Sequence, residues 1–406
     1  MKINYILLAI LLIAPIKKAS SQTINSTPIP ILLETNTTTS CPFFTKDFKG
    51  NPVISFGKET KVKKAVLCYS LFNSSNKKFQ RPIEIQSSKG IELHGENAPK
   101  IIFKPNKEII AVWGIDNASE KKKYSGLINY SQSFDNGKSW TKAKPLVKNT
   151  ASIDQRYFDI DLLPNGEVAI IWLDSRTKTE DEGSTLYYAE TKGTTGFQNE
   201  KPIAETTCQC CRTDLFISKN GTINAAFRDI INDEIRDMVL TYSTDNGKTF
   251  SKPNRISPDN WKINGCPHTG PTMTENENGL HFAWYTSGGG SGVFYNNSAD
   301  YGKSFSKRTI VSDKPSAKHP QITTLDNKEV LIVWDETTTD SDKIATQIGL
   351  QHRNKNGKIV STKYISPKNR ISSFPVIKAI NKKQFLVAWS QQSDDENVFY
   401  KIINID

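Results

Sequence analysis

Apolar and polar residues alternate in short runs along most of the chain, which is typical of half-buried β-strands rather than helices. The most regular feature is an aromatic residue near the end of such a run, at Trp113, Trp172, Phe227, Trp284, Trp334 and Trp389. Successive aromatics are 59, 55, 57, 50 and 55 residues apart. Repeats of this length are typical of propellers and related arrays, so the pattern predicts six copies of one all-β unit.

Each copy is expected to open with a hairpin. Fourteen residues before each aromatic, a first strand is expected to start, at Pro99, Phe158, Thr213, Gly270, Pro320 and Pro375. A turn such as Pro164-Asn165-Gly166 or Asn220-Gly221 separates this strand from the one that carries the aromatic. Asn-Gly supplies the positive φ angles that a tight hairpin needs, so the two strands are predicted to be antiparallel.

A third strand is followed by a turn of defined chemistry in three copies: Ser133–Trp140, Ser243–Phe250 and Ser298–Phe305. All three read Ser-x-Asp-x-Gly-x-Ser/Thr-Trp/Phe. The Ser and Asp oxygens suit bonds to nearby backbone N–H groups, the Gly suits a positive φ, and the aromatic can pack beneath. These aspartates are therefore predicted to be structural.

This motif resembles the Asp-box, or BNR repeat, of the sialidase superfamily. Together with the repeat it predicts a six-bladed β-propeller of four-stranded antiparallel blades over residues 46–406. Only 17 residues follow Trp389, so the N-terminal part is expected to close the ring, with strands at Ala65–Phe72 and Arg81–Ile85. Residues 22–45 are rich in Thr, Ser, Pro and Asn and are predicted to form a tether.

The first 21 residues have the layout of a signal peptide, with Lys2, an apolar run from Ile6 to Ile16, and small residues from Ala19 to Ser21. The run is too short to span a bilayer, so no transmembrane segment is expected and the protein is predicted to be secreted, periplasmic or on the cell surface. The formal net charge of +11 favours anionic partners. Because the lysines are scattered along the chain, binding of nucleic acid is not expected. The protein is also predicted to be a monomer.

Strand direction predicts which residues surround one mouth of the central channel. The first strand of each unit should line the channel, and the residues after each aromatic should return to the same rim. From the first strands this gives Arg156, Tyr157, Asp159, Cys211, Arg212, Asp214, His268 and His319. From the ends of the second strands it gives Asp174, Arg176, Arg228, Asp229, Tyr285, Asp335 and Glu336. Arginines among carboxylates and tyrosines suit recognition of an anionic sugar.

The resemblance implies roles for these residues, because sialidases hold the substrate carboxylate with three arginines, use a tyrosine nucleophile helped by a glutamate, and protonate through an aspartate. The matching arginine set is Arg156, Arg212 and Arg228. The tyrosine would be Tyr157 or Tyr285, and the acid Asp159, Asp174 or Asp229. Further substrate contacts would come from Arg176, Asp214, His268 and His319.

The expected function is therefore that of an exported, exo-acting, sialidase-like glycoside hydrolase on acidic glycans, without a cofactor. The Phe-Arg-Ile-Pro element of the sialidases is absent, because the first repeat reads Asn97-Ala98-Pro99-Lys100. A single arginine in a propeller is more often a salt bridge between blades. The alternative is a non-catalytic propeller that binds glycans or proteins.

The cysteines allow two interpretations. Cys211 and His268 each lie sixteen residues before their aromatic, so adjacent blades should bring the two segments together. Export favours disulfides, from the Cys208-to-Cys211 cluster to Cys266 and from Cys41 to Cys68. The alternative is a zinc or copper(I) site built from Cys208, Cys210, Cys211, Cys266 and His268.

The remaining histidines have no partner that the sequence identifies. A solvated or packed role is therefore expected for His94, His281 and His352.

Overall fold

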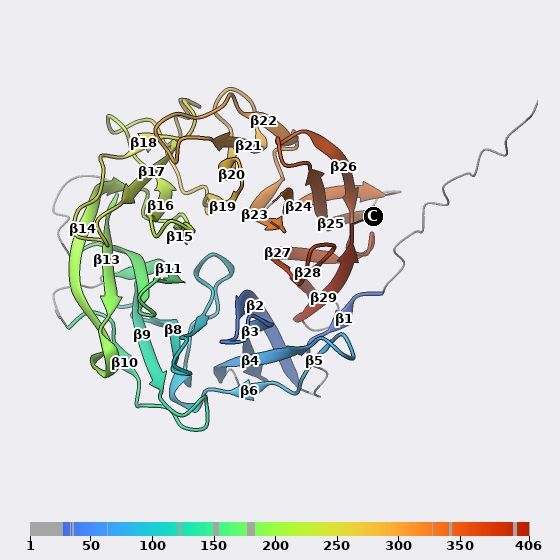
Figure 1. The fold of residues 1–406 in the computed structure, drawn as a ribbon. Coiled ribbons are helices and arrows are strands. Elements are labelled where there is room, and N and C mark those ends of the chain that lie inside the picture. Colours follow the sequence, from blue (N-terminus) through green and yellow to red (C-terminus); the bar gives the residue numbers. More distant parts are fainter. Residues whose placement is uncertain are drawn as a thin grey trace, which may run out of the picture.

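The computed structural model describes residues 27–32, 34, 36–62, 64–120, 123–148, 154–176, 183–326, 328–340, 343–392 and 396–405. Within these ranges the chain is all β apart from three short 3-10 turns, and Figure 1 shows its sheets arranged as a ring. The described part contains no helix with the length and apolar character needed to cross a membrane. The expected signal peptide and the start of the expected tether lie outside the described residues.

The strands form successive antiparallel units, here called blades, and in each blade the first strand lies nearest the axis of the ring (Figure 1). Blade 1 contains β2 (Thr37–Lys46), β3 (Pro52–Thr60), β4 (Ala65–Asn73), β5 (Lys78–Phe79) and β6 (Ile83–Glu84). Blade 2 contains β7 (Lys100–Phe103), β8 (Ile109–Asp116), β9 (Gly126–Ser133) and β10 (Lys144–Pro145). Blade 3 contains β11 (Gln155–Leu162), β12 (Val168–Asp174), β13 (Ser184–Thr191) and β14 (Phe197–Thr207).

Blade 4 contains β15 (Asp214–Ile217), β16 (Ile223–Arg228), β17 (Met238–Ser243) and β18 (Asn254–Arg255). Blade 5 contains β19 (Thr272–Asn276), β20 (Gly279–Thr286), β21 (Gly292–Ser298) and β22 (Thr309–Ser312). Blade 6 contains β23 (Lys318–Leu325), β24 (Glu329–Asp340), β25 (Lys343–Arg353) and β26 (Ile359–Tyr364). Blade 7 contains β27 (Ile371–Ala379), β28 (Gln384–Gln392), β29 (Glu396–Asn404) and β1 (Ile29–Pro30). The 3-10 turns are η1 (Gln86–Ser88), η2 (Gly95–Asn97) and η3 (Gly193–Thr195).

The prediction of an all-β propeller with four-stranded antiparallel blades is confirmed, but the predicted number of six blades is wrong. Contacts between inner strands run from β2 through β7, β11, β15, β19, β23 and β27 back to β2. Blades 6 and 7 share one eight-stranded sheet, in which a single parallel bridge from Thr346 to Ile371 joins two antiparallel halves. The described residues therefore form a ring of seven antiparallel units.

Blade 1 is the unit that the repeat count missed. Phe56 in β3 lies 57 residues before Trp113 and is fully buried, so it continues the same series of aromatics. Residues 37–45, expected in the tether, belong to the inner strand β2 instead. Thr and Ser are common in linkers, but Thr is also a favoured strand residue and half of a strand's side chains need not be apolar.

The two ends of the chain close the ring together, as expected, although the closing strand is a different one. β1 pairs with β29, with Ile29 opposite Tyr400, and completes blade 7. The strands expected to do this, at 65–72 and 81–85, correspond to β4 and β6 of blade 1.

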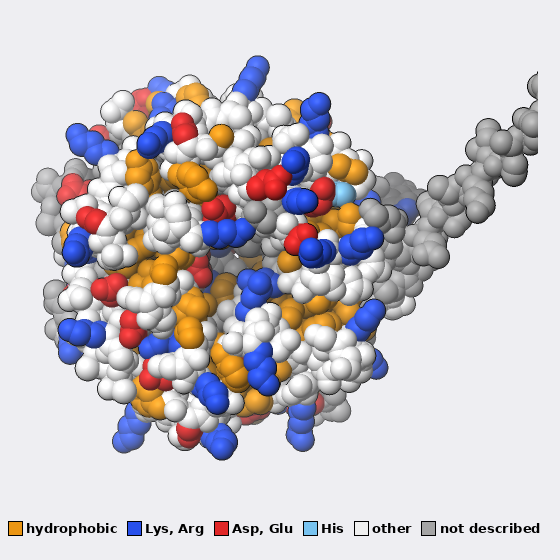
Figure 2. Space-filling view, viewed as in Figure 1, with side chains coloured by type: hydrophobic (Ala, Val, Ile, Leu, Met, Phe, Trp, Pro, Cys, Tyr) orange, Lys and Arg blue, Asp and Glu red, His pale blue; other side chains and the backbone are white. Residues whose placement is uncertain are grey.

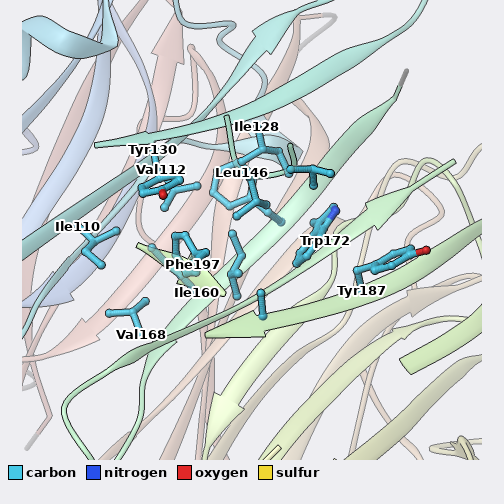
Figure 3. Packing of buried hydrophobic residues seen from close by; sticks show 14 of the residues in the cluster. Ile110, Val112, Ile128, Tyr130, Leu146, Ile160, Val168, Trp172, Tyr187 and Phe197 are labelled. Carbon is cyan, nitrogen blue, oxygen red and sulfur yellow. The ribbon is translucent and has the colours of Figure 1, made fainter. Parts of the chain in front are cut away.

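The apolar cores lie between neighbouring blades. In the core between blades 2 and 3, Leu146 and Ile128 from one blade meet Ile160 and Phe197 from the other (Figure 3). The repeated aromatics of the second strands lie in such cores with at most 2% of their surface exposed. Because the two facing sheets bury one shared core, each blade depends on both of its neighbours.

The three Ser-x-Asp turns have the predicted structural role. In the second copy, the backbone N–H of Thr249 donates to Asp245 at 2.9 Å, and the N–H of Gly247 donates to the Ser243 hydroxyl at 2.9 Å. The same bonds recur around Asp135 and Asp300. The hydroxyls of Ser139 and Ser304, followed by the backbone N–H groups of the same residues, donate to Asp135 and Asp300 and hold the pKa of these two carboxyls down to about 2.

Ring closure through β1 can be tested with two isoleucines. Ile31 is 7% exposed and packs in the core between blades 1 and 7, whereas Ile29 is 36% exposed. We expect Ile31→Ala to lower the free energy of unfolding by about 2–4 kcal/mol, because it leaves a cavity in that core. Urea denaturation measures this, and Ile29→Ala is the matched control. Equal effects of the two substitutions would contradict closure by this segment.

Candidate functional site

The inner strands enclose a small cavity on the axis of the ring. Its volume is about 70 Å³, enough for a few water molecules but not for a sugar. The segment between β6 and β7, cyan in Figure 1, extends to the centre of the ring and carries η2. Two of its residues, Gly95 and Glu96, line the cavity. On the face shown in Figure 2, the surface is hollowed at the ring centre, with Lys and Arg side chains at its edge.

Arg212 ties several blades together at this cavity. Its Nη1 donates to Glu96 Oε1 at 3.1 Å, and its Nη2 donates to the carbonyl oxygen of Pro320 at 2.9 Å. Weaker bonds reach the carbonyls of Gly270 and Pro271. The guanidinium is thus already used by the protein, in the structural role that a lone propeller arginine most often has.

His319 is held by carboxylates from two sides. Its Nδ1 lies 2.7 Å from Asp335 Oδ2 and its Nε2 lies 3.9 Å from Glu96, while its ring stacks on Phe374 at 4.1 Å. Burial alone would lower the pKa of His319, but Asp335 and Glu96 outweigh burial and raise it. His319 and Arg212 are thus two basic side chains that lie beside the buried Glu96.

Asp159 and Asp214 complete the buried charge network. Asp159 accepts from the backbone N–H of Leu215 at 2.8 Å, and Asp214 accepts from that of Met273 at 2.8 Å. Each aspartate thus bonds the inner strand of the next blade. Burial raises the pKa of both carboxyls, against the opposing effect of Lys100 on Asp159. Asp159, Asp214, Arg212 and His319 are therefore brought together as predicted, but as an inner lining that joins blades.

A row of strained residues surrounds the same axis. Cys41, Tyr157, His319 and Phe374 have φ angles between +50° and +56° and lie fifteen residues before their aromatic; His268, at +50°, lies sixteen before. Pairing shifts register there in β2, β11, β23 and β27. Such bulges aim a side chain out of the regular alternation, and strain of this kind clusters at functional sites.

Within this row, Tyr157 is 2% exposed and lies beside two polar side chains, His94 and Arg156. Its ring lies edge-on to the imidazole of His94, with centroids 6.1 Å apart, and the Arg156 guanidinium lies 5.4 Å from the Tyr157 ring. The amide oxygen of Asn97 accepts from the backbone N–H of Tyr157 at 2.7 Å, which fixes the bulge. Asp154 binds Arg156 through two bonds of 2.7 and 2.8 Å, yet the Arg156 side chain keeps 22% of its surface exposed.

Burial separates the pKa values of this pair in opposite directions. It lowers the pKa of His94, against the opposing field of Glu96, so the imidazole is neutral at pH 7. It raises the pKa of Tyr157, so the phenol keeps its proton. His94 Nδ1 is buried and has no hydrogen-bond partner among the described residues. A neutral imidazole beside a protonated phenol is an arrangement for transferring protons.

Three other predicted residues, Arg228, Asp174 and Arg176, are bonded to other protein groups in this fold. Arg228 is 1% exposed, donates to the carbonyls of Arg236 and Tyr285 at 2.9 and 2.8 Å, and lies 4.8 Å from the Trp261 ring. Asp174 is fully buried and accepts from the indole of Trp172 and from Arg176. Arg156, Arg212 and Arg228 therefore do not form one free arginine set.

The remaining predicted residues face elsewhere. The Tyr285 hydroxyl bonds the Ser287 hydroxyl at 2.9 Å and the Pro315 carbonyl at 3.2 Å. Asp229 accepts from the Thr206 hydroxyl and lines a groove along β14 rather than the axis. The Glu336 carboxylate accepts from the indole of Trp334 at 2.7 Å and pairs with Lys314.

Sequence reasoning missed the contribution of the segment before β7. His94, Glu96 and Asn97 all act at the axis, and only His94 was considered, as a solvated or packed residue. The sequence does contain a signal for this segment. Arg156 and Tyr157 lie sixteen and fifteen residues before Trp172, and the same distances before Trp113 give Asn97 and Ala98. Of the other histidines, His281 is packed as expected, and burial lowers its pKa to about 4.

The cysteines gather as predicted at the junction of blades 4 and 5. The Cys208 sulfur lies 3.7 Å from that of Cys210 and 3.5 Å from that of Cys211, and all six cysteines are free thiols in the structure. Cys41 and Cys68 cannot pair, because β3 separates their strands by about 9–10 Å, which is beyond the reach of a disulfide. The pairing predicted between those two cysteines is therefore wrong.

Comparison with known proteins gives matches in structure alone: neither protein-family models nor curated sequences match the chain. A Dyadobacter fermentans protein of unknown function has a TM-score of 0.56 at 15% identity, over 93% of this chain and 98% of that one. An ulvan lyase of polysaccharide lyase family 25 has a TM-score of 0.56 at 11% identity, over 93% and 96% of the two chains. A mutant of the NanB sialidase of Streptococcus pneumoniae has a TM-score of 0.52 at 11% identity, over 90% and 85%. The chain thus has the propeller fold that sialidases and this polysaccharide lyase share.

Proposed function

We propose that this chain is an exported enzyme that cleaves acidic glycans at the Tyr157 end of the channel. The observation that carries the proposal is the trio of His94, Tyr157 and Arg156, with a neutral base, a proton donor and a partly exposed cation side by side. Fold similarity to glycan-active propellers supports the substrate class only at the level of the fold.

In this proposal His94 removes a proton and Tyr157 supplies one. The lowered pKa keeps His94 in its basic form, and the raised pKa keeps Tyr157 in its acidic form, over the same range of pH. The part of the Arg156 side chain that stays exposed beside Asp154 binds the anionic group of the glycan. Arg212 and Arg228 are bonded to protein groups, so Arg156 alone of the three arginines would bind the anionic group of the substrate. Sialidases use three arginines for this purpose, so a single arginine does not favour sialic acid in particular.

Two reaction classes fit the pair. In hydrolysis, the class expected from the sequence, Tyr157 protonates the leaving oxygen and His94 activates a water. In β-elimination on a uronic acid, His94 removes the proton at C5, the electrons form the C4–C5 double bond, and Tyr157 protonates the departing O4. A specific observation favours elimination: burial raises the pKa of Tyr157, which disfavours the tyrosinate that a sialidase nucleophile requires. A similar structure is that of an ulvan lyase bound to a glucuronate-containing sugar.

Turnover of a glycan panel tests the proposal. We expect a uronate-containing polysaccharide to be cleaved with ultraviolet absorbance from an unsaturated product, whereas hydrolysis gives new reducing ends without that absorbance. Tyr157→Phe and His94→Ala should each lower kcat by about 10²–10⁴-fold, the usual contribution of one proton-transfer group. Tyr301→Phe, at a hydroxyl that bonds Glu275 near a Ser-x-Asp turn, is the matched control. Binding without cleavage of any acidic glycan would instead support the non-catalytic alternative.

Arg156 should act on binding of the acidic group. We expect Arg156→Gln to raise KM for an acidic glycan by about 10–100-fold, since a charged hydrogen bond is worth roughly 1.5–3 kcal/mol. The effect should shrink on an analogue in which the carboxylate is reduced to an alcohol. An equal loss on both substrates would show that Arg156 acts through the fold.

The pH dependence follows from the two pKa shifts. His94 must be deprotonated, so kcat/KM should rise with pH through a value below the ordinary 6.5. Tyr157 must be protonated, so activity should fall only above the ordinary tyrosine pKa of 10.0. A broad plateau between these limits is expected in a pH–rate profile. A falling limb near neutral pH would contradict these roles.

A further inference from the structure

The turn between β14 and β15 places three sulfur atoms around one point. Cys208, Cys210 and Cys211 are 0%, 4% and 1% exposed, and among the described residues the apolar side chain clustered with them is Ile230. The backbone N–H of Cys208 donates to the Arg228 carbonyl at 2.8 Å, which anchors the turn to β16. The Cys-x-Cys-Cys spacing then folds the other two thiols back toward the first, at 3.7 and 3.5 Å.

A second segment brings two more ligand groups from blade 5. The ligand atoms of Cys210, Cys266 and His268 all lie within 4.8 Å of one another. His268 has a φ of +50° and lies in the loop before β19. Cys210 thus belongs to both groups and connects the Cys208–Cys211 turn to the Cys266–His268 loop.

The spacing of the sulfurs distinguishes between the chemistries open to them. Sulfurs in a disulfide are about 2.05 Å apart, far less than the 3.5 and 3.7 Å in this turn. Thiolates bound to zinc at about 2.3 Å occupy the corners of a tetrahedron whose edges are about 3.8 Å. The two distances from the Cys208 sulfur are therefore close to the edges of a zinc–thiolate tetrahedron, and the third pair, Cys210 and Cys211, lies within 4.8 Å.

The surroundings suit a cluster of thiolates. Arg236 Nη1 donates to the Cys208 sulfur at 3.3 Å and is itself positioned by a bond from its Nε to the Ile263 carbonyl at 3.1 Å. A cation that donates to a bound sulfur offsets part of the negative charge of the ligands and orients them.

We propose that Cys208, Cys210 and Cys211, with a fourth ligand from the Cys266–His268 loop, bind one zinc ion. Three thiolates and one further Cys or His form a closed four-coordinate structural site. The thiol protons pass to solvent on binding. The ion would join blades 4 and 5 beside the channel, because the same loop ends at Thr269 and Gly270, whose carbonyls accept from Arg228 and Arg212. The site does not depend on the proposed glycan activity.

Metal analysis of the full chain, purified without chelator, tests the site. We expect about one zinc per chain, and replacement by cobalt should give the visible absorption of tetrahedral cobalt–thiolate. Cys210→Ser should abolish binding, because Cys210 belongs to both ligand groups. Cys266→Ser and His268→Ala, both at exposed positions, identify the fourth ligand by which of them weakens binding. Cys41→Ser, at a buried cysteine far along the chain, is the control and should keep the metal.

Thiol counting under denaturing, non-reducing conditions separates the metal from the disulfide expected in an exported protein. With zinc removed, six reactive thiols are expected. Four thiols and no metal would overturn the proposal in favour of a bridge from the cluster to Cys266. Six thiols in a protein that neither holds zinc as purified nor takes up cobalt would also overturn it. If Cys210→Ser does not fold, loss of zinc from Cys266→Ser or His268→Ala with an unchanged circular dichroism spectrum still decides the question.

Discussion

Each blade carries apolar side chains on both faces of its sheet, and these side chains are buried only when a neighbouring blade packs against each face. The large apolar clusters among the described residues combine side chains from two consecutive blades, including the pair that joins blade 7 to blade 1. Closure of the ring is therefore a condition for burying the last core, and the short strand β1 takes part by pairing with β29 and inserting Ile31. An open ring would leave two sheet faces in water, which explains why both ends of the chain meet in one blade.

Closure of the ring also buries charged and polar groups close together at the axis. Inner strands converge there, so backbone and side-chain polar groups from several blades share a space of about 70 Å³. The protein meets this with bonds that cross between blades, from Asp159 to Leu215 and from Asp214 to Met273, and with Arg212 beside Glu96. Several charged side chains that the sequence predicts as substrate contacts thus form bonds between blades instead. Two side chains beside this network have opposite pKa shifts: Tyr157, at the bulge of β11, and His94, in the segment before β7.

The cysteine turn and the Tyr157 trio lie on the same side of this network. Cys210 and Cys211 contribute to the field that raises the Tyr157 pKa, after burial and against Arg156. His268 lies with Cys210 and also acts on His94. A structural ion at the junction of blades 4 and 5 would therefore hold part of the wall of the candidate site without entering the reaction.

The sequence by itself determined the repeated unit, since aromatic spacing, Asn-Gly turns and Ser-x-Asp turns are local features set by strand period and turn geometry. It also brought the Cys208–Cys211 turn close to His268, because equal offsets in consecutive repeats become neighbours in space, although the residue grouped with His268 is Cys210 and not the predicted Cys211. It did not determine the number of units: β2 is rich in Thr and Ser, and only its pairing with β3, which carries the buried Phe56, shows that it belongs to a blade. Nor did it show that Arg228 would face backbone carbonyls while Arg156 remained partly exposed, or that the loop with His94 and Glu96 would reach the axis. Those outcomes depend on which side chains converge once the ring has closed, and convergence is a property of tertiary structure alone.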